Sequence, residues 1–164
     1  MKRRPYVAVS GVAATAKKKL PWKTDKEFAA CPRRLVGAVL VSRKTLGGQR
    51  VESLRYPSLA DAQALCAALA QSVVTPAVHY NSRTNGGDLL AELVALANHV
   101  PAMRMLQLNI ICPAVEVVEE FRRLHPWVEI VLQVSGETRA QYEGAGLNPW
   151  AVLADYGRVV DHLL

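Results

Sequence analysis

The chain has 164 residues, of which 51% are hydrophobic and 21% are charged, and its formal net charge is +6. This length suits one domain with a sizeable core, and the apolar content is too high for a disordered chain. No apolar run reaches the roughly 18 residues of a membrane-spanning helix, and the first residues lack the apolar stretch of a signal peptide. We therefore expect a single soluble domain in the cytoplasm, with no membrane partner.

The three cysteines, Cys31, Cys66 and Cys112, stand far apart in the chain. Because no Cys-x-x-Cys pair and no Cys/His cluster is present, the sequence predicts neither a disulfide framework nor a zinc site. It also lacks the carboxylate cluster of a typical divalent-cation site. We expect reduced thiols, no metal and no cofactor, with Cys112 close to a strand end.

Positive charge is concentrated in the first third of the chain. Residues 1–55 hold 14 Lys and Arg against 3 acidic residues, whereas residues 56–164 hold 6 against 11. Such asymmetry is typical of a protein that binds an anion through its basic part. Few aromatic residues accompany these cations, and no nucleic-acid-binding motif is present. A small phosphorylated or carboxylated substrate is therefore favoured over nucleic acid.

Short runs rich in Val, Ile and Leu recur without the polar–apolar alternation of a half-exposed sheet. Such runs are typical of parallel strands covered on both faces. Strands are predicted over 6–10, 36–42, 73–79, 103–111, 129–135 and 159–164.

Helical patterns separate several of these runs, over 59–70, 89–97, 114–124 and 150–156. Ser58 and Asp88 are suitable N-caps for the first two helices. Pro113 can open the third helix, and Pro149 fits the first turn of the fourth. Strands that alternate with helices predict one α/β domain with a parallel sheet.

Two α/β architectures compete for this pattern. A doubly wound dinucleotide-binding sheet requires a Gly-x-Gly-x-x-Gly loop after its first strand, and residues 10–14 read Ser-Gly-Val-Ala-Ala. A (β/α)8 barrel requires only repeated strand–helix units and has about 250 residues. We therefore predict an incomplete barrel of the TIM type over 1–164, with about six βα units present.

The predicted strands end in polar residues, where barrels of this type carry their chemistry. Three ends hold pairs spaced by two, His79 with Asn81, Gln107 with Asn109 and Gln133 with Ser135, and Ser10 and Ser42 end the first two strands. Because side chains spaced by two face the same side of a strand, we expect a polar ring around a small ligand. The alternative is that the strands merely become polar where they leave the core. Of these residues, His79 is the one suited to carry a proton.

Two basic loops follow the first and second strands, and in a barrel both would overhang the polar ends. The first holds five lysines between positions 17 and 26, and the second holds Arg43, Lys44, Arg50 and Arg55. Positive loops beside a polar cleft attract phosphate or carboxylate groups. The residues assigned to substrate binding are Arg43, Arg55, Asn81, Gln107, Asn109 and Gln133.

Four short stretches together resemble one enzyme family. They are Ala8-Val9-Ser10-Gly11, Ser53-Leu54-Arg55, Gln107-Leu108-Asn109-Ile110 and Val160-Asp161-His162-Leu163-Leu164. In order and spacing they resemble phosphoribosylanthranilate isomerase, a (β/α)8 barrel of tryptophan biosynthesis that rearranges an aminoaldose to an aminoketose. The resemblance implies an anionic phosphosugar substrate, which Arg55 would contact.

The departures from the family concern its base and its acid. The family has a cysteine as general base where this chain has Ser10, and a serine hydroxyl is a much weaker base than a thiolate. The resemblance places the general acid, an aspartate, beyond Leu164, whereas Asp161 should face helices or a neighbouring strand. We expect either a segment of a longer chain or an open remnant that forms homo-oligomers through its edges.

The leading hypothesis is an isomerase-like protein that binds or rearranges an anionic phosphosugar, with Ser10 and His79 as candidate catalytic residues. The alternative is a non-catalytic module that binds a metabolite or nucleic acid on the same fold. A third hypothesis is a different barrel enzyme in which His79 or Cys112 carries other chemistry.

Overall fold

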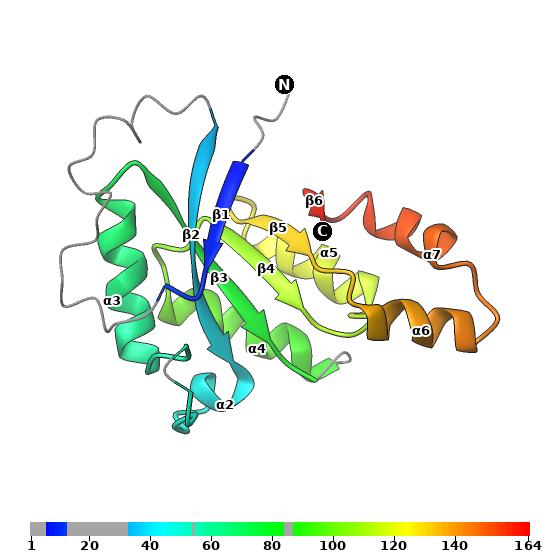
Figure 1. Ribbon diagram of the computed structural model, residues 1–164, viewed down its shortest axis with the longest axis horizontal. Helices are drawn as coiled ribbons and strands as arrows, with labels where there is room; N and C mark the ends of the chain where they lie inside the picture. The colour runs from blue at the N-terminus through cyan, green and yellow to red at the C-terminus, as the bar shows by residue number, and fades with distance from the viewer. Residues whose placement is uncertain (1–5, 13–32, 54, 84–86) are drawn as a thin grey trace.

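The computed structural model describes residues 6–12, 33–53, 55–83 and 87–164 (Figure 1). Within them six strands form one sheet in the order of the chain: β1 (Tyr6–Ser10), β2 (Arg34–Ser42), β3 (Val74–Asn81), β4 (Met105–Asn109), β5 (Glu129–Leu132) and β6 (His162–Leu163). All five strand pairings are parallel. The helices are α2 (Arg43–Leu46), α3 (Leu59–Ala70), α4 (Gly87–His99), α5 (Val115–Leu124), α6 (Gly136–Gly144) and α7 (Pro149–Tyr156). The predicted parallel α/β fold is confirmed.

The strand order excludes the doubly wound alternative, because in such a sheet the order reverses and helices cover both faces. Here the large core lies on one face of the sheet. The strands contribute Val39, Val41, Val78, Tyr80, Leu106, Leu108, Ile130 and Leu132, and the helices contribute Cys66, Leu69, Leu89, Leu93, Leu96, Val118, Phe121, Leu153 and Tyr156. The opposite face carries a smaller cluster of Val36, Ala38, Ala77, Met105 and Val131.

Two contacts across the second face show that the sheet is strongly curled. Arg34 of β2 donates two hydrogen bonds, of 2.5 and 2.6 Å, to the carboxylate of Glu129 of β5, although β3 and β4 lie between these strands. The ring centroids of Tyr6 in β1 and His162 in β6 are 5.0 Å apart. In a flat sheet these two strands would stand about 24 Å apart. The six strands therefore form a curled half-barrel, and Figure 1 shows β1 in front of the sheet with α4 and α5 behind it.

The same four side chains close the amino-terminal end of the concave face. Nε2 of His162 lies 3.3 Å from Oε2 of Glu129, so the carboxylate faces both the Arg34 guanidinium and the His162 ring. The Arg34 hydrogen bonds hold the pKa of Glu129 below its usual range. Tyr6, Arg34, Glu129 and His162 therefore fill this end of the half-barrel, although Nε of Arg34 has no hydrogen-bond partner among the described residues.

Caps define most of the helix ends. Ser58 caps α3 by accepting a hydrogen bond from the Asp61 amide at 3.1 Å, and α3 spans the predicted residues. Pro149 lies in the first turn of α7 as predicted. Two predictions of helix starts are wrong: Asp88 lies inside α4 rather than before it, and α5 begins after its N-cap Ala114, so that Pro113 lies outside the helix. None of the helices described is both long and apolar enough to cross a membrane.

Helices α2 and α6 were not predicted from the sequence. Each starts at a serine that follows a strand: the Thr45 amide donates to Ser42 Oγ at 3.2 Å, and the Thr138 amide donates to Ser135 Oγ at 3.1 Å. Both serines were expected to face a ligand. Their hydroxyls cap helices, because each is followed three residues later by an unpaired first-turn amide, and both residues also line the cavity described below.

Replacing Glu129 by glutamine removes the charge that pairs with Arg34 across the concave face. Since these side chains are 36% and 29% exposed, we expect the free energy of unfolding at pH 7 to fall by about 1–2 kcal/mol in urea denaturation. The folded-state pKa of Glu129 is lowered, so its contribution is present above the unfolded-state pKa and is lost as the pH falls through the folded-state pKa. Acidification should therefore reduce the difference between wild type and Glu129→Gln.

The control for this experiment is Glu120→Gln, because Glu120 forms an exposed ion pair with Arg123 on a single helix. We expect its effect on the free energy of unfolding to be much smaller. Equal losses in the two variants would contradict a stabilising role for the pair that crosses the half-barrel.

Candidate functional site

A chain of hydrogen-bonded amides lies at the carboxyl ends of β3 and β4. Asn81 and Asn109 are in register across these strands. Asn109 Nδ2 donates to Asn81 Oδ1, and Asn81 Nδ2 donates to the Tyr56 hydroxyl at 2.9 Å. The tyrosine comes from the segment between α2 and α3 and was not singled out in the sequence. Two predicted site residues are thus brought together and tied to a third.

His79 lies on the same side of β3 as Asn81, in register with Gln107 of β4. Gln107 Nε2 donates to Gln133 Oε1 at 2.8 Å, so these two amides satisfy each other. In contrast, both ring nitrogens of His79 are buried and have no hydrogen-bond partner within the described part of the chain. Buried polar atoms are almost always hydrogen-bonded, so this ring lacks a partner that a ligand or water would supply.

The pKa of His79 is lowered by burial and, to a smaller degree, by the positive charge of Arg55. Both causes disfavour the imidazolium form. At neutral pH the ring is therefore neutral and has one nitrogen lone pair that can accept a proton. This is the chemistry expected of a general base.

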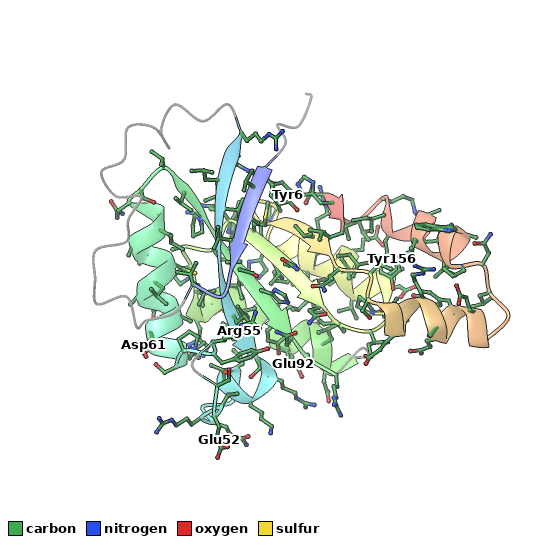
Figure 2. All side chains as sticks on the ribbon, viewed as in Figure 1. Tyr6, Glu52, Arg55, Asp61, Glu92 and Tyr156 are labelled. Carbon is green, nitrogen blue, oxygen red and sulfur yellow. The ribbon has the colours of Figure 1, made fainter. Side chains whose placement is uncertain are left out.

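Arg55 and the turn after β1 lie against each other. Gly11 has a φ of +81°, which favours glycine, and its amide donates to the Ala38 carbonyl at 2.9 Å. A Cβ atom at Gly11 would lie 3.6 Å from Nε of Arg55, and Figure 2 shows Arg55 close to the end of β1. Ser10 is exposed and in register with Ala38, a residue of the concave face. Ser10 and Arg55 therefore lie at the carboxyl end of β1, at the same end of the half-barrel as the amide chain.

A cavity of about 580 Å³ opens beside the amide chain. Three cationic side chains line it, those of Arg43, Lys44 and Arg83, against one carboxylate, that of Glu137. Its other lining residues are Ser42, Val51, Tyr56, Asn81, Ser82, Asn109, Ile111 and Ser135. A larger hollow of about 830 Å³ lies along the segment between α2 and α3, and it contains none of the predicted site residues. We therefore centre the candidate site on the smaller cavity.

Arg43 is held at this cavity by Glu92 of α4, which Figure 2 labels. Nε of Arg43 lies 2.9 Å from Oε1 of Glu92. Glu92 is only 11% exposed, and its Oε2 accepts hydrogen bonds from the hydroxyls of Tyr80 at 2.7 Å and Ser82 at 2.9 Å. Sequence reasoning missed this glutamate. The sequence does contain a signal for it, because a carboxylate next to Leu93 on the apolar side of a predicted helix needs a partner.

The predicted site residues therefore fall into three neighbouring groups. Arg43, Asn81 and Asn109 line the cavity; His79, Gln107 and Gln133 lie on the concave face; and Ser10 and Arg55 lie at the end of β1. The five lysines between 17 and 26 lie outside the described residues.

Asp161 faces the helices, as expected. Arg122 of α5 donates two hydrogen bonds of 3.1 Å to its carboxylate, and the Ile130 amide donates a third at 2.8 Å. Its side chain is thereby committed to the outer layer and does not supply an acid to the concave face.

The two cysteines that the structure describes are free, and Cys31 lies outside the described residues. Burial raises the pKa of the Cys66 thiol to about 12, so this residue behaves as part of the core. Cys112 is half-buried in the turn after β4, with a φ of +46°. Over the described residues, no three His, Cys, Asp or Glu side chains are grouped as ligands of a metal ion would be.

Comparison with protein families, with curated proteins and with solved structures finds no match for this chain. Its function must therefore be argued from the geometry of the strand ends.

An NMR titration of the His79 ring tests the electrostatics of the site. Replacing Arg55 by glutamine removes a positive charge that disfavours the imidazolium, so the pKa of His79 should rise toward its ordinary value. The burial contribution remains, so the pKa should stay below that value. Arg50→Gln, a change of the same type in the same segment, should leave the titration unchanged. A His79 pKa that is identical in wild type and Arg55→Gln would show that the two side chains do not interact.

Proposed function

We propose that this protein binds an anionic phosphosugar at the carboxyl ends of its strands, in the manner of phosphoribosylanthranilate isomerase. The observation that carries the proposal is the proximity of Gly11 and Arg55, since a Cβ atom at Gly11 would lie 3.6 Å from Nε of Arg55. These residues end the two stretches, Ala8-Val9-Ser10-Gly11 and Ser53-Leu54-Arg55, that resemble the family's base motif and substrate-contacting motif. Their meeting at one end of the half-barrel supports a shared site.

The architecture supports the same proposal. Sequential strand order, a helix-covered outer face and a strong curl are the features that a (β/α)8 barrel requires. In such barrels the chemistry lies at the carboxyl ends of the strands, which is where the amide chain, His79 and Arg55 gather. We therefore assign the half-barrel to the TIM type as part of this proposal.

The roles of the residues follow from their chemistry. Arg55 is suited to bind the substrate's carboxylate, since a guanidinium forms paired hydrogen bonds with that group. His79, a neutral imidazole without a partner, is better suited than the Ser10 hydroxyl to accept the proton in an Amadori-type shift. Rearrangement also requires an acid that protonates the sugar-ring oxygen. Binding is thus the first function to test, and isomerisation the second.

A non-catalytic metabolite-binding module is the second candidate, because serine stands at the position of the family's base. Nucleic acid is the less favoured ligand. The described cations at the strand ends surround a cavity of small-molecule size, whereas nucleic acid is bound through many phosphate contacts along an extended surface.

Calorimetric titration with a non-reactive phosphoribosylanthranilate analogue tests the proposal. Wild type should bind the analogue, and Arg55→Ala should weaken binding by about ten- to a hundredfold, because the carboxylate loses a charged partner. Arg50→Ala is the matched control and should bind as wild type does. Equal affinities of wild type and Arg55→Ala would remove Arg55 from the site, and no binding by wild type would refute the proposed function.

Consumption of phosphoribosylanthranilate itself separates the two candidates. Turnover by wild type that is lost in His79→Gln would assign the isomerase reaction. Binding without turnover would assign the metabolite-binding module.

A further inference from the structure

The cavity at the carboxyl ends of β2 to β5 carries positive charge that the described residues do not neutralise. Arg43, Lys44 and Arg83 line a volume of about 580 Å³ together with one carboxylate, Glu137, and a second carboxylate, Glu92, pairs with Arg43 from outside the lining. Neither Lys44 nor Arg83 has an ion pair or a hydrogen bond with any side chain that the structure describes. Cations that line one cavity repel one another, and an anionic ligand removes that repulsion.

The Arg43 side chain is 59% exposed, and an ion pair with Glu92 orients its guanidinium. Its anchor, Glu92, is itself fixed by hydrogen bonds from Tyr80 and Ser82, both at the end of β3. A buried carboxylate oriented by two hydroxyls, which in turn orients an arginine, is the type of support that binding residues require. Of the three cations, Arg43 is thus the one whose orientation the fold supports.

The uncharged residues that line the cavity offer both a hydrogen-bond donor and a hydrogen-bond acceptor. The Tyr56 hydroxyl accepts from Asn81 and keeps its own hydrogen for donation. Asn109 donates to Asn81, and its carbonyl oxygen has no partner within the described part of the chain. A donor beside an acceptor suits the hydroxyl groups of a sugar. The cavity volume also lies within the range of about 300–1,000 Å³ that is typical of small-molecule sites. This volume is far larger than a phosphate ion alone would fill.

We propose that this cavity binds the phosphorylated end of a sugar phosphate, with the phosphate at Arg43, Lys44 and Arg83 and the sugar hydroxyls at Tyr56 and Asn109. A phosphate monoester carries about −1.5 to −2 charges at pH 7 and would meet three cations, of which Arg43 already pairs with Glu92. The inference rests on the proposed function, since it assigns the phosphate end of the substrate whose carboxylate Arg55 binds. It differs from that proposal because it concerns the phosphate of the ligand rather than its carboxylate, and because it assigns other residues to the binding.

Calorimetric titration with ribose 5-phosphate tests the inference, because this compound has the phosphate and the hydroxyls but no carboxylate. Wild type should bind it, and unphosphorylated ribose should bind at least about tenfold more weakly. The double variant Lys44→Gln/Arg83→Gln should lose at least about tenfold in affinity for ribose 5-phosphate. Arg158→Gln, which changes an exposed arginine after α7, is the control and should bind as wild type does. Circular dichroism and thermal unfolding of each variant establish that it is folded.

The outcomes separate this inference from the proposed function. Absence of ribose 5-phosphate binding by wild type, or equal affinities of wild type and the double variant, would overturn the phosphate assignment. The proposed function would still stand if the analogue bound through Arg55.

Binding of ribose 5-phosphate that depends on Lys44 and Arg83 but is unchanged in Arg55→Ala supports the inference. If the analogue then bound no better than ribose 5-phosphate, the cavity assignment would survive and the proposed function would fail. Inorganic phosphate bound as tightly as ribose 5-phosphate would overturn the sugar contacts.

Discussion

Helices α3, α4, α5 and α7 pack on the same side of the parallel sheet, so the other side has to be closed by the strands themselves. Curling achieves this by bringing β1 and β2 toward β5 and β6. At the amino-terminal end, the Arg34–Glu129 ion pair joins strands that are separated by two others in the sheet, and Tyr6 and His162 meet beside it. The curl also gathers the carboxyl ends of the strands, and the candidate site depends on that gathering.

Both ends of the concave face hold buried polar atoms that lack a partner in the described part of the chain. At the amino-terminal end, Glu129 is bonded to Arg34 and lies close to His162, while Nε of Arg34 has no hydrogen-bond partner. At the carboxyl end, both His79 nitrogens have none, and Lys44 and Arg83 are exposed cations without an ion pair among the described side chains. The proposed site lies at the carboxyl end, where the unpartnered ring and the unpaired cations occur together.

The basic residues of the chain have different structural roles, and counting them does not predict which role each one has. Arg34 belongs to the basic first third but is used to close the half-barrel. Arg43 and Arg55 come from the same third and reach the site, whereas Arg83 joins them from the acidic remainder. Charge asymmetry along a sequence therefore predicts an anionic ligand, but it does not identify the cations that meet it.

Local patterns were enough to predict the parallel strands, the full extent of α3 and the placement of His79 with Asn81 and of Gln107 with Asn109 on one side of their strands. The third predicted pair is wrong, because β5 ends at Leu132, before Gln133, and Ser135 caps α6. Strand composition, N-caps and the two-residue period act over a few residues, so they can be read directly. The short helices α2 and α6 were missed because their serine caps at the strand ends resembled ligand-facing residues. Glu92 and Tyr56 were missed because their importance lies in partners from other elements.

The curl, the proximity of Gly11 and Arg55 and the cavity were decided by the tertiary structure alone. Each depends on residues that are distant in the chain, as Arg34 and Glu129 are at 95 positions apart. Such pairs depend on how the whole sheet curls, and no period or motif within either strand records which residue will lie opposite.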